Sequence, residues 1–438
     1  MAFCAGLLAL VLAACTPHRE LYPRLESLAA GGKYTEAAKL VEANKSTYGE
    51  RNAVLYNLDR GVFYHYAGEY EASNRAFEAA EQRIDELFTT SISGEVGAFM
   101  VNDNTLPYRG EDFESVVINI YRALNYARLD DLEAALVEAR KVDLKLTQIN
   151  RQYAPEDRNA YREDAFARLL MGIFYEEEGT REDLNDAYIS NRLALSIYQR
   201  SFAPDYGATA PEVLKRNLVT TATFMGPEEL AQAREATGLE PGSLDERRRA
   251  ARLVLVHYAG RSPVKVENSL TTVVDGNLLR VAFPGYRARS YLIHGSRARI
   301  DAETVVRLEE GQPTGAIAMR NLADRRGRVA AKAIARAVTK YVANRRLQKN
   351  AQDQGGGAGL LAFVLGNVYA VATEQADLRA WQTLPDKILI GSTFVAPGVH
   401  RVVVEYLTSG GGVVSTRDLG EMELAPGTVR FIILHTNT

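Results

Sequence analysis

The chain has 438 residues, which is too long for one ordinary hydrophobic core and indicates two or three domains. Hydrophobic residues make up 46% and charged residues 24%, the profile of a folded protein, and the net charge of -3 provides no overall field that would favour nucleic acid or an anionic membrane. The only two cysteines are Cys4 and Cys15, so removal of the first residues would leave no disulfide and no thiol pair for redox or zinc chemistry.

The first residues predict a secretory signal. An apolar run from Gly6 to Ala14 ends at Cys15 and is too short to span a bilayer, which needs about 20 apolar residues. The run has the h-region and small-residue cleavage site of a signal peptide, although no Lys or Arg precedes it. Leu12-Ala13-Ala14-Cys15 also resembles the bacterial lipobox, whose cysteine takes a diacylglyceryl group. We therefore expect residues 1–14 to be a lipoprotein signal peptide; an ordinary signal peptide with an incidental cysteine is the alternative.

Lipidation of Cys15 would anchor the mature chain to a membrane through two or three acyl chains. Thr16, rather than Asp, follows the cysteine. By resemblance to enteric lipoprotein sorting, this favours the outer membrane, with the body of the protein facing the periplasm.

A motif of small and aromatic residues recurs over residues 15–225. Gly32-Lys33-Tyr34-Thr35-Glu36-Ala37 is followed by Gly68-Glu69-Tyr70-Glu71-Ala72-Ser73, and two further copies cover 123–139 and 172–194. The spacing is that of tetratricopeptide repeats, and four copies satisfy the need for at least three stacked units. We predict a tetratricopeptide-like α-solenoid whose concave groove binds envelope proteins.

A polar segment from Asn102 to Glu114 separates the second and third copies, and it is rich in turn-forming residues. Long loops in compact domains are often functional, so Tyr108, Arg109, Glu111 and Asp112 are candidate partner-binding residues. The alternative is structural: Asp112 and Glu114 complement a helix N-terminus, and Tyr108 fills a gap between repeats.

The pattern changes after a predicted linker helix at 226–250. Strands are expected at 253–256, 264–266, 278–283 and 291–293, and Pro-Gly turns at 397–398 and 426–427 start two more. Residues 251–438 are therefore predicted to form a smaller β-sandwich-like domain with a helical insertion at about 300–375. The predicted fold class is α+β.

The insertion is basic and then apolar. From Arg325 to Lys349 it holds many Lys and Arg residues and no acid, and Lys332, Arg336 and Lys340 are spaced by four, which predicts one cationic ridge. Such a ridge suits anionic lipid, glycan or an acidic partner, or it is simply a solvated face. The apolar run 360–372 is too short to span a bilayer and predicts a buried helix after a glycine hinge; contact with another copy or with the bilayer is the alternative.

Several segments together carry a family resemblance. The order of lipobox, repeats, Tyr-Arg-Gly-Glu-Asp-Phe-Glu at 108–114, then 135–140, 260–265 and 376–385, resembles a poorly characterised family of bacterial tetratricopeptide-containing outer-membrane lipoproteins. The resemblance covers nearly the whole mature chain and implies an envelope setting without implying a reaction. From the last two segments we add Lys265, Asp377, Arg379 and Trp381 to the candidate partner-binding residues; Asp377 and Arg379 are expected to pair, and Trp381 to anchor its segment.

Signals of catalysis are weak. No two of the six histidines have metal-ligand spacing, and no Gly-x-Ser-x-Gly motif occurs, so we expect no catalytic residue, no metal, no cofactor and no nucleic-acid partner. The acidic run Glu176-Glu177-Glu178 is attributed to solvation of a turn. The predicted function is a scaffold or adaptor in envelope assembly, either in regulation of peptidoglycan synthesis or in export of surface material. The alternatives are a structural subunit of an outer-membrane complex, which would be a homo-oligomer, and an enzyme that acts on cell-wall glycan with paired carboxylates.

Overall fold

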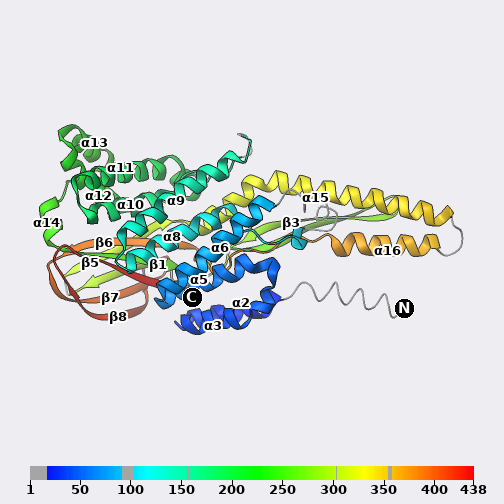
Figure 1. Ribbon diagram of the computed structural model, residues 1–438, viewed down its shortest axis with the longest axis horizontal. Coiled ribbons are helices and arrows are strands. Elements are labelled where there is room, and N and C mark those ends of the chain that lie inside the picture. The colour runs from blue at the N-terminus through cyan, green and yellow to red at the C-terminus, as the bar shows by residue number, and fades with distance from the viewer. Residues whose placement is uncertain (1–16, 91–102, 155–157, 302, 354–357) are drawn as a thin grey trace.

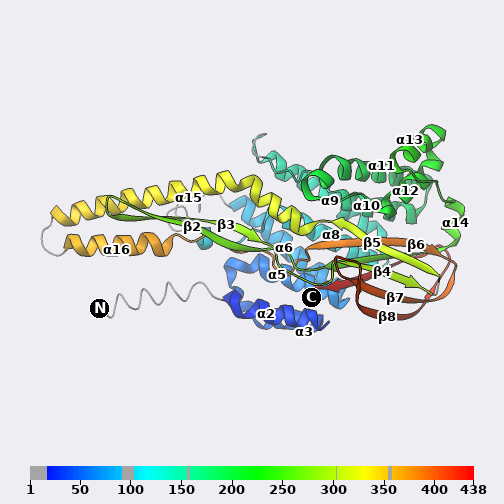
Figure 2. The same ribbon diagram turned by 180° about the vertical axis from the view of Figure 1, so that it is seen from behind.

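The structure is a computed structural model that describes residues 17–90, 103–154, 158–301, 303–353 and 358–438 (Figure 1). The fold is mixed α+β, as predicted: helices occupy the first part of the chain, and a nearly closed β-sheet follows. The predicted signal peptide and Cys15 lie outside the described residues. The molecule consists of a body, in which helices cover the sheet, and a long arm that projects from one end of it (Figures 1 and 2).

Antiparallel helix pairs form most of the first part, joined by shorter helices. The helices are α2 (Pro17–Ala30), α3 (Tyr34–Ala43), α4 (Lys45–Tyr48), α5 (Ala53–Ala67), α6 (Tyr70–Thr90), α8 (Asp112–Arg128), α9 (Leu132–Arg151), α10 (Ala165–Glu178), α11 (Arg181–Ile197), α12 (Glu212–Met225), α13 (Pro227–Thr237) and α14 (Leu244–Arg249), with 3-10 turns η1 (Glu50–Asn52) and η2 (Asp103–Thr105) and a π-helix, η4 (Tyr198–Tyr206).

The recurring small residues have two visible roles. Gly32, Gly68 and Gly179 lie in turns between paired helices with φ of 70°, 80° and 68°, a backbone region that glycine enters without steric cost. Other glycines permit close helix contact: a Cβ at Gly61 would lie 2.5 Å from the Phe77 ring, so only glycine fits there. The repeat spacing in the sequence therefore marks real turns and contacts between helices.

The second part forms a seven-stranded sheet in the order β8-β7-β4-β5-β6-β1-β9. Its strands are β1 (Ala251–Ala259), β4 (Gly295–Ile300), β5 (Thr304–Gln312), β6 (Lys387–Val395), β7 (Gly398–Leu407), β8 (Val413–Leu424) and β9 (Val429–Thr436). All neighbours are antiparallel except β1 and β9, which are parallel. The side chain of His257 on β1 lies 2.9 Å from the hydroxyl of Ser296 on β4, which is not its neighbour, so the sheet curves around its own apolar interior.

The helices pack directly on the sheet, and one hydrophobic core joins the two parts. Tyr121 of α8 stacks on Tyr258 of β1 with ring centroids 4.9 Å apart, and Phe174 of α10 lies 5.8 Å from Phe431 of β9. Tyr198 donates a hydrogen bond of 2.7 Å to the carbonyl of Gly311 on β5. The inner surface of the helical layer is thus covered by the chain's own sheet.

The arm consists of a β-hairpin and two helices. The hairpin pairs β2 (Val264–Val274) with β3 (Asn277–Arg287), and α15 (Thr314–Asp353) and α16 (Ala358–Thr373) pack against each other and against β3. Asp275 and Gly276 form the tip of the hairpin, both with positive φ. This is the Asp-Gly turn favoured by tight hairpins. No described helix is long and apolar enough to cross a membrane.

Three local predictions differ from the structure. The expected strand at 291–293 is a loop, and β4 begins only at Gly295. Part of the range expected to be a helical insertion, Thr304–Gln312, is strand β5. The expected burial of α16 is wrong for Val364, Leu365 and Val368, which are exposed.

Candidate functional site

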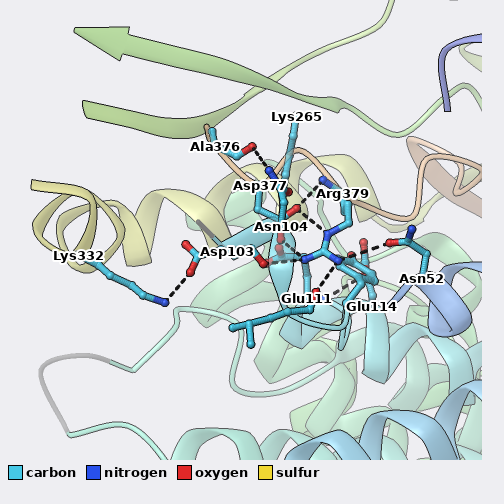
Figure 3. Close-up of polar contacts among 12 residues, drawn as sticks. Asn52, Asp103, Asn104, Glu111, Glu114, Lys265, Lys332, Ala376, Asp377 and Arg379 are labelled. Carbon is cyan, nitrogen blue, oxygen red and sulfur yellow. Dashed lines mark hydrogen bonds and ion pairs between the residues drawn. The ribbon is translucent and has the colours of Figure 1, made fainter. Parts of the chain in front are cut away.

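All the candidate partner-binding residues except Arg109 and Asp112 meet in one region, where the arm joins the body. Figure 3 shows Glu111, Lys265, Asp377 and Arg379 there. We call this region the junction. It gathers the start of α8, η2, the base of β2, part of α15 and the segment 374–386, and its core residues are Asp103, Tyr108, Glu111, Glu114, Lys265, Arg325, Asp377, Arg379 and Trp381. Arg109 is exposed.

Glu111 at the start of α8 joins three elements. Its carboxylate forms ion pairs with Lys265 of β2 and Arg325 of α15, and all three side chains are largely buried. Burial alone would raise the pKa of Glu111, but the charges of Arg325 and Lys265 outweigh it and hold the pKa well below its usual range. The residue is therefore ionised and fixes the base of the arm to the helical layer.

Glu114 lies one helical turn further and is fully buried. It accepts hydrogen bonds from the Tyr108 hydroxyl at 2.5 Å, the Glu111 amide at 3.0 Å and the Trp381 amide at 2.7 Å. Burial, reinforced by the charge of Glu111, raises the pKa of Glu114 to about 7. This carboxyl group ties the segment 374–386 to α8.

The segment 374–386 is held by Arg379 and Trp381. Arg379 pairs with Asp377 at 2.7 Å, as predicted, and donates hydrogen bonds to the carbonyls of Leu106 and Asp103 (Figure 3). The Trp381 side chain is buried in the helical layer. Its ring centroid lies 5.8 Å from the Tyr121 ring. Trp381 anchors its segment to the helical layer.

Asp112 has a different set of contacts. Its carboxylate accepts hydrogen bonds from Tyr153 at 2.9 Å and from Asn159 at 2.7 Å. The structural alternative for this loop therefore describes it well, since Asp112 and Glu114 both lie in the first turn of α8 and Tyr108 is buried.

The predicted cationic ridge of α15 is correct in its spacing but wrong in its direction. Arg336 and Lys340 point inward and are 2% and 5% exposed. Lys340 lies 2.9 Å from the buried Glu374, and Arg336 lies 3.0 Å from Asp103, which Lys332 also contacts at 2.8 Å. Buried cations need such partners, so this face of α15 belongs to the junction rather than to solvent.

Two members of the acidic run 176–178, Glu176 and Glu177, are paired rather than solvated, whereas Glu178 is exposed as expected. Glu176 and Glu177 form ion pairs with Arg252, which is 1% exposed, and Glu176 also pairs with Arg247. Glu176, Glu177 and Arg247 line a cavity of about 180 Å³ next to Phe394. The cluster joins α10 to β1, and its charges are neutralised within the chain.

The junction has the chemistry of a rigid joint. Its carboxylates are matched with cations, hydroxyls or amides, and breaking a buried ion pair costs about 3–5 kcal/mol because it leaves one charge unpaired. Within the described residues no group of acidic, His or Cys side chains has the arrangement of a metal site. The arrangement therefore sets the angle and the position of the arm relative to the body.

Sequence reasoning does not identify Arg325 of the junction, nor Asp59, which holds the segment 374–386 through Thr383. Arg325 was seen only as part of a basic segment, and its partner Glu111 is 214 residues away. Asp59 was not noticed at all, although its buried carboxylate accepts hydrogen bonds from Tyr22, Tyr48 and Thr383. Pairings over such separations leave no spacing pattern in a single sequence.

Comparison with known proteins adds no assignment: no family model matches the chain, and no curated protein matches it.

Proposed function

We propose that the chain is a lipid-anchored scaffold of the bacterial cell envelope, attached through Cys15 to the outer membrane and facing the periplasm. The lipobox-like Leu12-Ala13-Ala14-Cys15 supports the anchor. Helix α2 begins two residues after Cys15, and its first residues lie at the end of the body from which the arm projects (Figures 1 and 2). An acyl chain on Cys15 would hold this end of the body close to the membrane.

The arm is the observation that carries the proposal. Residues 268–274 of β2 are exposed throughout, among them Leu270 at 68% and Val273 at 63%. In the described residues β2 pairs only with β3, so its other edge has unpaired backbone groups. Exposed apolar patches and unpaired strand edges are typical contact sites for other proteins. A rigid body that presents such an arm suits a protein that positions partners in peptidoglycan synthesis or in export of surface material.

Two finer features of the fold belong to this proposal. We propose that three helix pairs, α5–α6, α8–α9 and α10–α11, are tetratricopeptide-like units of a solenoid. Because the sheet would then fill the groove of this solenoid, we propose that partners contact the arm instead of the groove. The sheet is proposed to be sandwich-like because its two halves face each other across apolar side chains such as Leu255, Val404 and Ile432.

Fractionation and cross-linking test the proposal. The wild-type chain is expected in the outer-membrane fraction, and Cys15→Ser in the soluble periplasm. A photo-cross-linking amino acid at Leu270 or Leu278 should capture envelope proteins in cells. The same probe at Val305 or Val399, which are exposed on the body, serves as the control. Equal capture from arm and body, or a cytosolic wild-type chain, would refute the proposal.

A second candidate is a structural subunit of an outer-membrane assembly, which the exposed face of α16 favours. Val364, Leu365 and Val368 are 45–48% exposed on a helix that has no charged residue. Copies of the chain could bury these faces against one another. Light scattering in detergent would then show a discrete oligomer, and Val364→Asn with Leu365→Asn would dissociate it. A monomeric wild-type chain would instead favour the scaffold.

A further inference from the structure

The outer face of α15 differs from the inner face that enters the junction. It is a continuous stripe because its members are spaced by three and four residues along the helix. Its apolar members are Ile334, Val338 and Val342, exposed by 51%, 47% and 42%. Towards the end of the helix the stripe continues with exposed basic residues, which are Arg345, Arg346 and Lys349. We call these six residues the outer stripe.

The outer stripe cannot turn inward, because the opposite face of the same helix is fixed. Lys340 pairs with the buried Glu374 of the segment that follows α16, and Asn344 donates a hydrogen bond of 3.3 Å to Asn277 of β3. The apolar side chains on the outside are therefore a permanent feature of the folded chain. Figure 1 shows α15 running along the whole length of the arm.

The charges of the stripe favour an anionic partner. From Arg325 to Gln352 the helix contains no acidic residue. Asp275 at the tip of the hairpin lies 3.1 Å from Arg345, so its carboxylate offsets one of the three positive charges of the stripe and leaves the stripe net positive. A second copy of the chain would bring up a helix with the same excess of cations and no acidic residue between 325 and 352, and that repulsion disfavours an interface between identical stripes.

We propose that the outer stripe binds the surface of a membrane that contains anionic phospholipids. Apolar side chains bordered by Lys and Arg on one helix face are the pattern of helices that lie in the plane of a membrane. Ile334, Val338 and Val342 enter the boundary between headgroups and acyl chains, while the basic residues contact phosphate groups. The stripe provides a contact about 22 Å long, at 1.5 Å per residue from Ile334 to Lys349. This surface is independent of the anchor at Cys15, so it adds a second membrane contact to the proposed function.

The test uses the full chain with Cys15→Ser, which has no acyl group. Flotation is compared between vesicles of pure phosphatidylcholine and vesicles of equal parts of phosphatidylcholine and phosphatidylglycerol. The protein is expected to float only with the anionic vesicles, and less so as salt is added. Each basic residue near an anionic surface contributes roughly five-fold, so Arg345→Gln, Arg346→Gln and Lys349→Gln together should weaken binding by roughly a hundred-fold. Ile334→Asn with Val338→Asn should weaken binding to a similar degree. This loss should be the same at every salt concentration, because it removes apolar contacts rather than charges.

Matched controls separate the stripe from the overall charge and exposure of the chain. Lys39→Gln, Arg75→Gln and Arg430→Gln remove three exposed charges elsewhere, and Val305→Asn with Val399→Asn remove exposed apolar side chains from the body. Both controls should bind like the parent chain. Unchanged thermal unfolding would show that the stripe variants remain folded.

Two results would overturn the proposal. In one, the stripe variants and the controls bind vesicles equally. In the other, sedimentation without vesicles shows that the parent chain associates with itself and that Ile334→Asn with Val338→Asn abolishes this association, which would assign the stripe to a second copy. Because every chain in the test has Cys15→Ser, a failure of the proposed anchor leaves the outcome unaffected.

Discussion

Glu111 at the start of α8 and Lys265 at the base of β2 are 154 residues apart in the chain and form a buried ion pair. Arg325 of α15 completes the group, so one carboxylate connects the helical layer to both the hairpin and the long helix of the arm. The position of the arm therefore depends on this carboxylate.

Glu111→Gln should lower the free energy of unfolding by about 3–5 kcal/mol, because Lys265 and Arg325 would remain buried without a countercharge. Urea denaturation followed by intrinsic fluorescence measures the change. Glu163→Gln is the control, since its pair with Arg200 is about half exposed and should contribute less than about 1 kcal/mol. Equal effects of the two substitutions would contradict the role assigned to Glu111.

The inward direction of Lys340 can be tested by hydrogen exchange. Lys340→Met should loosen the arm, because it leaves the buried Glu374 with Arg336 as a more distant partner at 3.6 Å. Hydrogen exchange of the α15 and α16 amides should become faster, while exchange in the body changes little. Lys332→Met is the control. Because the Lys332 side chain is nearly half exposed, the exchange rates of this variant should stay close to those of the wild type.

Gly61→Ala should destabilise the chain by about 1–3 kcal/mol, because the added methyl group would lie 2.5 Å from the Phe77 ring. Gly327→Ala on α15 meets no atom within 4 Å and should stabilise the helix by about 0.5–1 kcal/mol. Thermal unfolding of both variants measures the contrast. If both substitutions shift the midpoint in the same direction, the close approach of α5 and α6 is not what requires glycine.

Glu114 should make stability depend on pH. Burial raises its pKa from 4.5 to about 7, so the folded state holds a proton that the unfolded state releases. Its contribution is therefore fully present below about pH 4.5 and is lost as the pH rises through about 7. Glu114→Gln should remove this loss, so that the variant gains stability relative to the wild type between pH 5 and 7, by up to about 3 kcal/mol. Free energies of unfolding measured across this range would show a constant difference if Glu114 is already ionised at pH 5.

The local elements were predictable where short-range patterns determine them. The glycines at 32, 68 and 179 mark turns, and the Pro-Gly sequences at 397–398 and 426–427 lie at or just before the starts of β7 and β9. The Asp-Gly tip of the hairpin has an equally clear signal that the strand assignment did not use. Such patterns involve only neighbouring residues, so a single sequence is sufficient to find them.

The arrangement of these elements in space was not predictable. Spacing by four showed that Arg336 and Lys340 share a face of α15, but it could not show that the face points inward, because their partner Asp103 lies far away in the chain and Glu374 follows α16. The run at 291–293 has the apolar character of a strand, yet the Tyr291 hydroxyl donates a hydrogen bond of 2.5 Å to Asp386 from a loop. In both cases the local sequence is compatible with two structures, and tertiary contacts determine which of them forms.

The packing of the helical layer on the sheet has a consequence for how the chain is made. Strand β9 follows all the helices in chain order, yet it contacts α5 and α8 and forms an edge of the sheet. During synthesis the aromatic residues that line the helices, such as Tyr121 and Phe174, therefore emerge long before the strands that cover them. Until those strands follow, the helices expose apolar surface that is prone to aggregation, so the first half of the chain is expected to need chaperones while the second half is still being made.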